Sequence, residues 1–135
     1  MITAGVDLGA KTVKVLILKD DKVIGRGITT TGLDQKESAD KAFADALAEA
    51  KIELKEIEKT VATGVGRKEA PHSTGEITEV GADAKAAFFL NPKVRTVIDV
   101  GGEEGRGIKC SDQGKAADFA INENAKERLM ARKYS

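Results

Sequence analysis

The chain has 135 residues, enough for one domain or for a large part of a two-lobed protein. Its 22 basic and 22 acidic side chains cancel, so charge indicates neither a nucleic-acid partner nor a membrane surface. The single cysteine, Cys110, excludes an internal disulfide and a metal site built from cysteines. No apolar run is long enough to span a membrane and the first residues lack a signal-peptide pattern, so we expect a cytoplasmic protein.

Residue patterns in the first part of the chain predict a strand meander, a helix and a further strand. The second strand is almost continuously apolar, which is typical of a strand inside a sheet. Asp34 is expected to cap the following helix, in which Phe43 and Leu47 lie near a stripe of alanines. A helical turn is expected at residues 54–57. The expected strands are residues 2–8, 13–18, 23–28 and 59–65.

The second part of the chain predicts another helix and a second meander. The helix is expected over residues 76–90, where Asn91 and Pro92 end it. The strands expected next are residues 94–100 (a buried strand), 107–110 and 115–121, with a short helix at 123–134. This order predicts an α/β fold of ribonuclease-H-like type, a mixed sheet with flanking helices. We expect a first lobe at residues 1–93 and the start of a truncated second lobe at 94–135.

The organising feature of the sequence is a near-repeat of an Asp-x-Gly turn. Residues 5–12 and residues 97–104 each read as a β-branched run that ends in Asp-x-Gly and then returns to an extended pattern. A glycine directly after a strand lets the backbone approach a ligand, and the Asp supplies a carboxylate for a metal. The same pattern is also ordinary turn chemistry. Two copies favour a pair of hairpins that bind one anionic ligand, for which a nucleoside triphosphate with Mg²⁺ is the candidate.

The first turn carries residue types that suit phosphate binding. Asp7 is the candidate catalytic and metal-side carboxylate. Gly9 and Ala10 leave room for phosphate oxygens, while Lys11 and Thr12 supply a positive charge and a hydroxyl. We expect these four residues to contact the nucleotide.

The second turn repeats this pattern with acidic residues after it. Asp99 is the counterpart of Asp7, and Gly101 and Gly102 provide the close backbone approach. Glu103 or Glu104 is a candidate for orienting water toward a terminal phosphate, and Glu103 is the one we select as catalytic. A solvated turn is an equally simple interpretation of both glutamates.

Other residue patterns in the chain are weaker indications of a functional site. The chain has neither a P-loop nor a dinucleotide-binding fingerprint. Gly64, Gly66 and Arg67 form a loop after an inner strand, and that position makes them candidate nucleotide contacts, although a helix-entry loop has the same composition. Lys14 is one polar residue in an apolar strand, which usually marks the solvent side. His72 has no neighbouring cysteine or histidine and is expected on the surface.

Four segments together resemble a known family. The chain is similar to the ATPase subunits of benzoyl-CoA reductase, especially the D-type subunit, and to the activators of 2-hydroxyacyl-CoA dehydratases. These proteins belong to the superfamily of acetate kinase, heat-shock chaperones and actin. The segments that carry the resemblance are residues 5–15, 62–67, 75–79 and 97–106.

The resemblance implies a two-lobed, actin-like ATPase fold with Asp7 on the first phosphate hairpin and Asp99 on the second, both holding Mg²⁺ through water. It also implies ATP as a ligand and ATP hydrolysis coupled to low-potential electron transfer. In the family this reaction serves the reductive dearomatisation of benzoyl-CoA in anaerobic cytoplasm, together with other reductase subunits. Family members form dimers or pseudo-dimers that share one four-iron, four-sulfur cluster, so a homodimer is expected.

The sequence departs from the family after residues 118–123. The family continues there with a cluster-binding cysteine, whereas this chain reads residues 124–135 and stops, without the adenosine-binding segment. We therefore expect no iron–sulfur cluster. Two interpretations stay open, and with them whether the chain is an enzyme. It is either the N-terminal part of such an ATPase, with weak ATP-Mg²⁺ binding, or a non-catalytic truncated or engineered fragment that folds and self-associates.

Overall fold

The computed structural model describes residues 1–101 and 104–122. The chain divides into two compact units, Met1–Thr78 and Glu79–Ser135. Each unit is described by itself. This division groups residues 79–93 with the second unit, whereas the lobes expected from the sequence place them in the first. Among the described residues, no helix is both long and apolar enough to cross a membrane.

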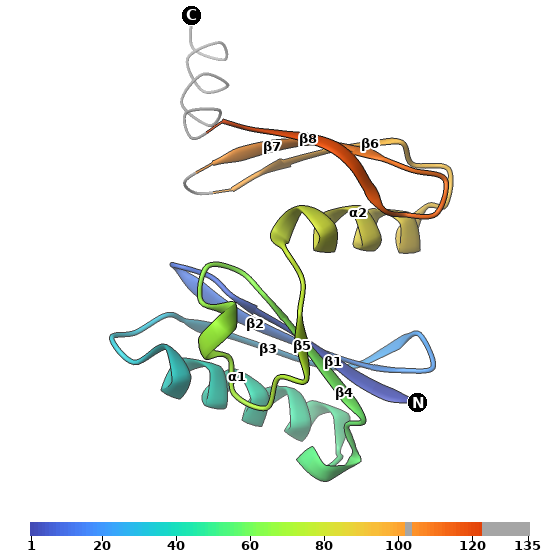
Figure 1. The fold of residues 1–135 in the computed structure, drawn as a ribbon. Helices are drawn as coiled ribbons and strands as arrows, with labels where there is room; N and C mark the ends of the chain where they lie inside the picture. Colours follow the sequence, from blue (N-terminus) through green and yellow to red (C-terminus); the bar gives the residue numbers. More distant parts are fainter. Residues whose placement is uncertain (102–103, 123–135) are drawn as a thin grey trace, which may run out of the picture. The chain divides into compact units, whose positions relative to one another are not determined.

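The first unit is a five-stranded mixed sheet with one long helix on a face (Figure 1). The strand order is β3-β2-β1-β4-β5, in which β1 runs antiparallel to β2 and parallel to β4. Helix α1 contacts β3, β2 and β1. The elements of this unit are β1 (Ile2–Leu8), β2 (Thr12–Lys19), β3 (Lys22–Thr30), α1 (Gln35–Ala50), η1 (Leu54–Glu56), β4 (Lys59–Thr63), η2 (Arg67–Glu69) and β5 (Gly75–Glu76).

Alternating side chains and two glycines place α1 on this sheet. Val6 and Leu8 are buried in the core with Phe43 of α1, while Asp7 between them lies on the other face. Gly25 and Gly27 of β3 let the helix backbone approach, because a Cβ at either position would overlap a carbonyl oxygen of α1. The helix begins after its predicted cap: the Asp34 carboxylate accepts hydrogen bonds from two backbone N–H groups of the first turn, at 3.0 and 3.2 Å.

The second unit packs one helix on a three-stranded antiparallel sheet of order β6-β7-β8. Its small core contains Val80 and Ala84 of the helix with Ile108 and Cys110 of β7, and Val97 packs against them. Cys110 is buried. The elements of this unit are α2 (Glu79–Leu90), β6 (Thr96–Val100), β7 (Gly105–Cys110) and β8 (Ala116–Asn122).

The element order and the α/β fold class are confirmed, with two corrections. Residues 76–78 are not helical, because Gly75–Glu76 pairs with β4 as the short parallel strand β5 and α2 starts at Glu79. The prediction of a buried strand at 94–100 was wrong: β6 alternates between partly buried and exposed residues, and Ile98 is 77% exposed. Among the described strands, β6 is an edge of its sheet. The helix expected at 123–134 lies outside the described residues.

Candidate functional site

The turn between β1 and β2 is closed by backbone hydrogen bonds. The Gly9 N–H donates to the Thr12 carbonyl oxygen at 3.0 Å. Thr31, which follows β3, supports the turn from the side: its N–H donates to the Lys11 carbonyl at 2.9 Å and its hydroxyl donates to the Gly9 carbonyl at 3.0 Å. The turn that the sequence selected is therefore braced by three hydrogen bonds at the end of β1, directly beside Asp7.

The loop after β4 lies against the same turn. Asp7 is paired in register with Thr63, the last residue of β4. Gly64 has a φ of +93°, and a Cβ there would lie 2.6 Å from the Leu8 carbonyl oxygen and 2.7 Å from Asp7 Oδ1. The Gly66 N–H donates to the Leu8 carbonyl at 2.9 Å. This close approach is open to glycine because it has no Cβ and tolerates positive φ.

The Arg67 side chain is held by its own loop. Its Nη1 donates to the Gly64 carbonyl at 3.1 Å, and its Nε lies 4.0 Å from a Glu76 carboxylate oxygen. The first unit therefore brings together every residue that the sequence selected in it. These are Asp7, Gly9, Ala10, Lys11 and Thr12 of the turn and Gly64, Gly66 and Arg67 of the loop.

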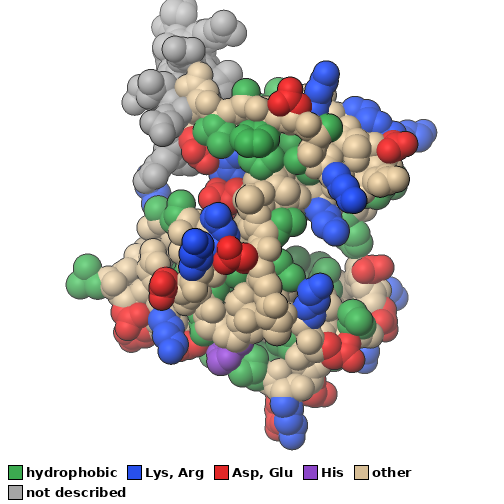
Figure 2. Space-filling view, in the orientation of Figure 1, with side chains coloured by type: hydrophobic (Ala, Val, Ile, Leu, Met, Phe, Trp, Pro, Cys, Tyr) green, Lys and Arg blue, Asp and Glu red, His purple; other side chains and the backbone are tan. Residues whose placement is uncertain are grey.

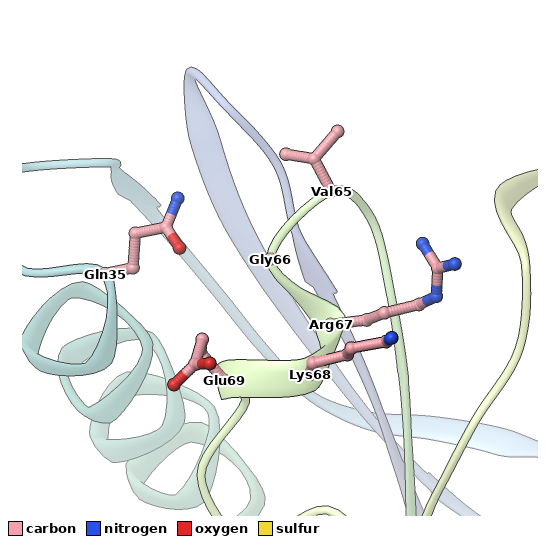
Figure 3. Close-up of a pocket in the computed structure, with 6 residues that line it drawn as sticks. All are labelled: Gln35, Val65, Gly66, Arg67, Lys68 and Glu69. Atoms are coloured by element: carbon pink, nitrogen blue, oxygen red, sulfur yellow. The ribbon is translucent and has the colours of Figure 1, made fainter.

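A shallow pocket of about 320 Å³ adjoins this loop. It is lined by Gln35, at the start of α1, and by residues 65–69. Figure 3 shows that the Arg67 and Lys68 side chains extend away from α1, whereas Glu69 extends toward it. Asp7 does not line this pocket. The pocket is a polar neighbour of the candidate site rather than its centre.

Two further polar residues, neither selected as a site residue from the sequence, lie beside Asp7. Lys14 is the cross-strand partner of Asp7 in the β1–β2 register, so both side chains lie on the sheet face that α1 does not cover. Among the described residues, neither side chain forms an ion pair. The Thr63 hydroxyl oxygen is buried and has no hydrogen-bond partner in the described part of the chain. Lys14 is exposed, as the sequence analysis expected of one polar residue in an apolar strand.

The second turn repeats the backbone geometry of the first. The Gly101 N–H donates to the Glu104 carbonyl oxygen at 2.8 Å, at the spacing from Asp99 that Gly9 and Thr12 have from Asp7. Asp99 is paired in register with Arg106, as Asp7 is with Lys14. The sequence repeat is thus also a repeat of turn and register. The remaining selected residues, Gly102 and Glu103, lie outside the described residues.

Arg106 is surrounded by four carboxylates. Its guanidinium reaches Glu79 at 2.6 Å, Glu104 at 3.0 Å, Asp83 at 3.1 Å and Asp99 at 3.5 Å. The Arg106 side chain is only 10% exposed. Glu79 and Asp83 belong to the first two turns of α2, so the cluster joins that helix to the second turn. Sequence reasoning did not find this cluster, because acidic residues on a helix are usually solvated.

The cluster strongly shifts the pKa of one of its carboxyl groups, that of Asp83. Burial, together with the hydrogen bond and negative charge of Asp99, raises the pKa of Asp83 to about 7. The nearby Arg106 opposes this shift, and the carboxylates in turn raise the pKa of Arg106. Asp83 therefore changes its protonation near neutral pH. Within the described residues, no group of three or more His, Cys, Asp or Glu side chains is arranged to hold a metal ion by itself.

The amino-acid sequence matches a known family over most of its length. Residues 4–125 match the BadF/BadG/BcrA/BcrD ATPase family. The activator of lactoyl-CoA dehydratase from Anaerotignum propionicum is 33% identical over 127 residues, which are 91% of this chain and 48% of that protein. The D-type subunit of benzoyl-CoA reductase from Thauera aromatica is 30% identical over 125 residues, 89% of this chain and 44% of that protein.

Two solved structures match the chain over a similar share of its length. Component A of the (R)-2-hydroxyglutaryl-CoA dehydratase of Acidaminococcus fermentans superposes with a TM-score of 0.84 and 27% identity, covering 91% of this chain and 48% of that one. The activator of the 2-hydroxyisocaproyl-CoA dehydratase from Clostridium difficile, solved with bound ADPNP, has a TM-score of 0.82 and 22% identity, covering 97% and 53%. The chain thus spans about half the length of the relatives it matches.

Proposed function

The chain belongs to the BadF/BadG/BcrA/BcrD ATPase family, and we propose that it binds the phosphates of ATP together with Mg²⁺ at its two Asp-x-Gly turns. The observation that carries this proposal is the repeated turn: a glycine N–H closes each one, at 3.0 and 2.8 Å, beside an Asp whose cross-strand partner is basic. The shared loop length accounts for the closing hydrogen bond and the register, so it is the carboxylate and its basic partner at both turns that favour a shared ligand class.

The residues of the first turn fit a phosphate with its metal ion. Asp7 would hold Mg²⁺ through water, and Lys14 and Lys11 would supply positive charge to phosphate oxygens. Thr12 adds a hydroxyl, while Gly9 and Ala10 give the ligand access to the backbone. The Cβ-free approach of Gly64 to Asp7 and the unpartnered Thr63 hydroxyl are features of a polar site that a ligand completes.

The second turn would act on the same ligand class through Asp99, Gly101 and Gly102. If Mg²⁺ is bound there, it would supply positive charge to the phosphates, and the residues of this turn would contribute mainly by positioning the ligand. Glu103 would orient a water for in-line attack on the terminal phosphate. Gly64, Gly66 and Arg67 support Asp7 from the neighbouring loop, since Gly66 and Arg67 anchor it by hydrogen bonds.

We further propose that the chain works in the activation of an acyl-CoA dehydratase or a benzoyl-CoA reductase. Its relatives are named as such activators and as part of such a reductase. In this role it would act in the cytoplasm with other subunits of the enzyme system, and ATP hydrolysis would drive electron transfer. An iron–sulfur cluster in this chain is not part of the proposal, because Cys110 is its only cysteine and is buried.

An NMR titration of the full chain tests the nucleotide proposal. ATP with Mg²⁺ is expected to shift the amide signals of Gly9 and Gly101, since each lies in a turn beside a metal-binding carboxylate. The amide of Gly75, in β5, serves as the internal control. Absence of any shift at Gly9 and Gly101 at millimolar ATP-Mg²⁺ would refute the proposal.

A second candidate function is self-association as a homodimer without catalysis. Ile98 is 77% and Val100 is 43% exposed on β6, an edge among the described strands. Figure 2 shows hydrophobic side chains on the surface over the strands of the second unit. An open edge and exposed apolar residues favour pairing with a second copy. Light scattering decides this: a dimer that Ile98→Lys converts to monomer supports it, and a monomer at high concentration contradicts it.

A further inference from the structure

The basic residues beside the two Asp-x-Gly turns differ in what they contact. Lys14 is exposed and forms no ion pair with any described residue, so its charge is available to a ligand. Arg106 occupies the equivalent register position, but its side chain is 10% exposed and contacts four carboxylates. The two basic residues therefore hold equivalent positions in the repeat, but Lys14 is exposed whereas Arg106 is enclosed by carboxylates.

Each nitrogen of the Arg106 guanidinium already donates to a carboxylate within the second unit. Its Nε donates to Glu104 at 3.0 Å, its Nη1 to Asp83 at 3.1 Å and its Nη2 to Glu79 at 2.6 Å. Bonds of this kind between ionised groups are the stronger hydrogen bonds of proteins, and a planar guanidinium makes several at once. These bonds use three of the five N–H donors, and with a side chain only 10% exposed little of Arg106 is open to a phosphate oxygen.

We propose that Arg106 is a positioning residue of the second turn, which holds Asp99 and Glu104 against the first turns of α2 and does not itself bind phosphate. The proposal rests on nucleotide binding at the Asp-x-Gly turns and assigns the two basic residues different tasks. Lys14 meets the ligand, whereas Arg106 fixes the carboxylate that the ligand's metal ion needs. Its role is that of an outer-shell partner, which orients a metal-binding group without touching the metal.

The cluster also fixes where the second turn is anchored. Glu79 is the first residue of the second unit and follows Thr78, the last residue of the first. Through Arg106, the Asp99 turn is thus tied to the segment at which the chain passes from one unit to the other.

Glu79→Gln is the deciding variant, because it keeps the size of the side chain but removes the negative charge from the 2.6 Å contact and so weakens it. Arg106→Gln leaves four carboxylates without their cation and risks unfolding the unit. Arg106→Lys serves as the conservative variant. The matched control is Lys109→Gln, which removes one charge from the same strand at an exposed position outside the cluster.

The first measurement needs no nucleotide. Hydrogen exchange at the Gly101 amide, which closes the second turn, is expected to become roughly tenfold faster in Glu79→Gln as its support is lost, a change of about 1.4 kcal/mol in local opening. Arg106→Lys is expected to fall between wild type and Arg106→Gln, because an ammonium cannot reach all four carboxylates at once. Unchanged exchange at Gly101 in Glu79→Gln would overturn the positioning role.

The second measurement is the dissociation constant for ATP-Mg²⁺. If Arg106 positions Asp99, Glu79→Gln weakens binding, by roughly tenfold as for other outer-shell changes. If Arg106 were a phosphate ligand restrained by carboxylates, removing one carboxylate would free it and tighten binding, which would overturn the proposal. If the wild-type chain binds no ATP-Mg²⁺, the nucleotide proposal fails, while the exchange of Gly101 still decides whether Arg106 supports the turn.

Discussion

Replacement of Gly64 by alanine is expected to damage both the stability of the first unit and its nucleotide site. Gly64 has a φ of +93°, and its added Cβ would lie 2.6 Å from the Leu8 carbonyl oxygen and 2.7 Å from Asp7 Oδ1. Ordinary contacts to a Cβ lie beyond 3.4 Å. The Leu8 obstacle is backbone and cannot turn aside, whereas the Asp7 oxygen is a side-chain end that would have to leave its position in the turn.

The expected loss of unfolding free energy is the sum of two costs, reduced by one opposing contribution. A left-handed backbone conformation costs a non-glycine residue about 1–2 kcal/mol. Overpacking against neighbouring atoms costs about 1–3 kcal/mol. The smaller conformational freedom of alanine in the unfolded chain returns about 0.4–1 kcal/mol. The unfolding free energy of the Gly64→Ala variant should therefore fall by about 3 kcal/mol, a large share of the 5–15 kcal/mol typical of a folded protein.

Urea unfolding followed by circular dichroism measures this loss. Gly75→Ala is the matched control, because a Cβ at Gly75 meets no atom within 4 Å. We expect the control to change the unfolding free energy by less than about 0.5 kcal/mol. Equal losses in the two variants would show that Gly64 is not needed for the approach of the loop to Asp7. Where Gly64→Ala remains folded, it should also bind ATP-Mg²⁺ more weakly than Gly75→Ala.

Other expectations concern the cap, the acidic cluster and the thiol. Asp34→Ala should lower the unfolding free energy by about 1 kcal/mol, measured by urea unfolding, and an unchanged midpoint would contradict the cap. Because the folded-state pKa of Asp83 is raised from 3.8 to about 7, folding takes up a proton between these values, so stability should fall as pH rises from about 4 to 7. With the Asp83 side chain still 27% exposed, solvent screening limits this loss to about 1 kcal/mol, and Asp83→Asn should abolish it. Cys110, 6% exposed, should react with a thiol reagent only when its unit opens, and rapid labelling of native protein would refute that packing.

Local patterns were sufficient to predict much of the fold. Alternation around Val6, Leu8 and the β2 valines identifies a sheet with one buried face, and a helix begins directly after Asp34 as its cap chemistry requires. The glycine turns end the strands where the chain reverses. These features depend on neighbours in sequence, so the residues themselves contain the information.

Structural features that depend on contacts between residues far apart in the chain were missed in the sequence analysis. Strand β5 has two residues and no period of its own, and its backbone pairs because β4 lies beside it. The apolar run around Ile98 predicts burial, but burial depends on which elements cover a face, and α2 covers one face of that sheet. The surroundings of Arg106 required α2 to place Glu79 and Asp83 over β7, which no short window of the sequence contains.

Calorimetric titration of the chain with ATP-Mg²⁺ is the measurement to make first, on wild type, Asp7→Asn and the control Asp45→Asn. Asp45 is an exposed carboxylate on α1, so its change alters net charge equally but leaves the turn intact. We expect wild type and Asp45→Asn to bind alike and Asp7→Asn to bind at least about tenfold more weakly. No binding by wild type, or equal binding by all three, would contradict a nucleotide site at the first Asp-x-Gly turn.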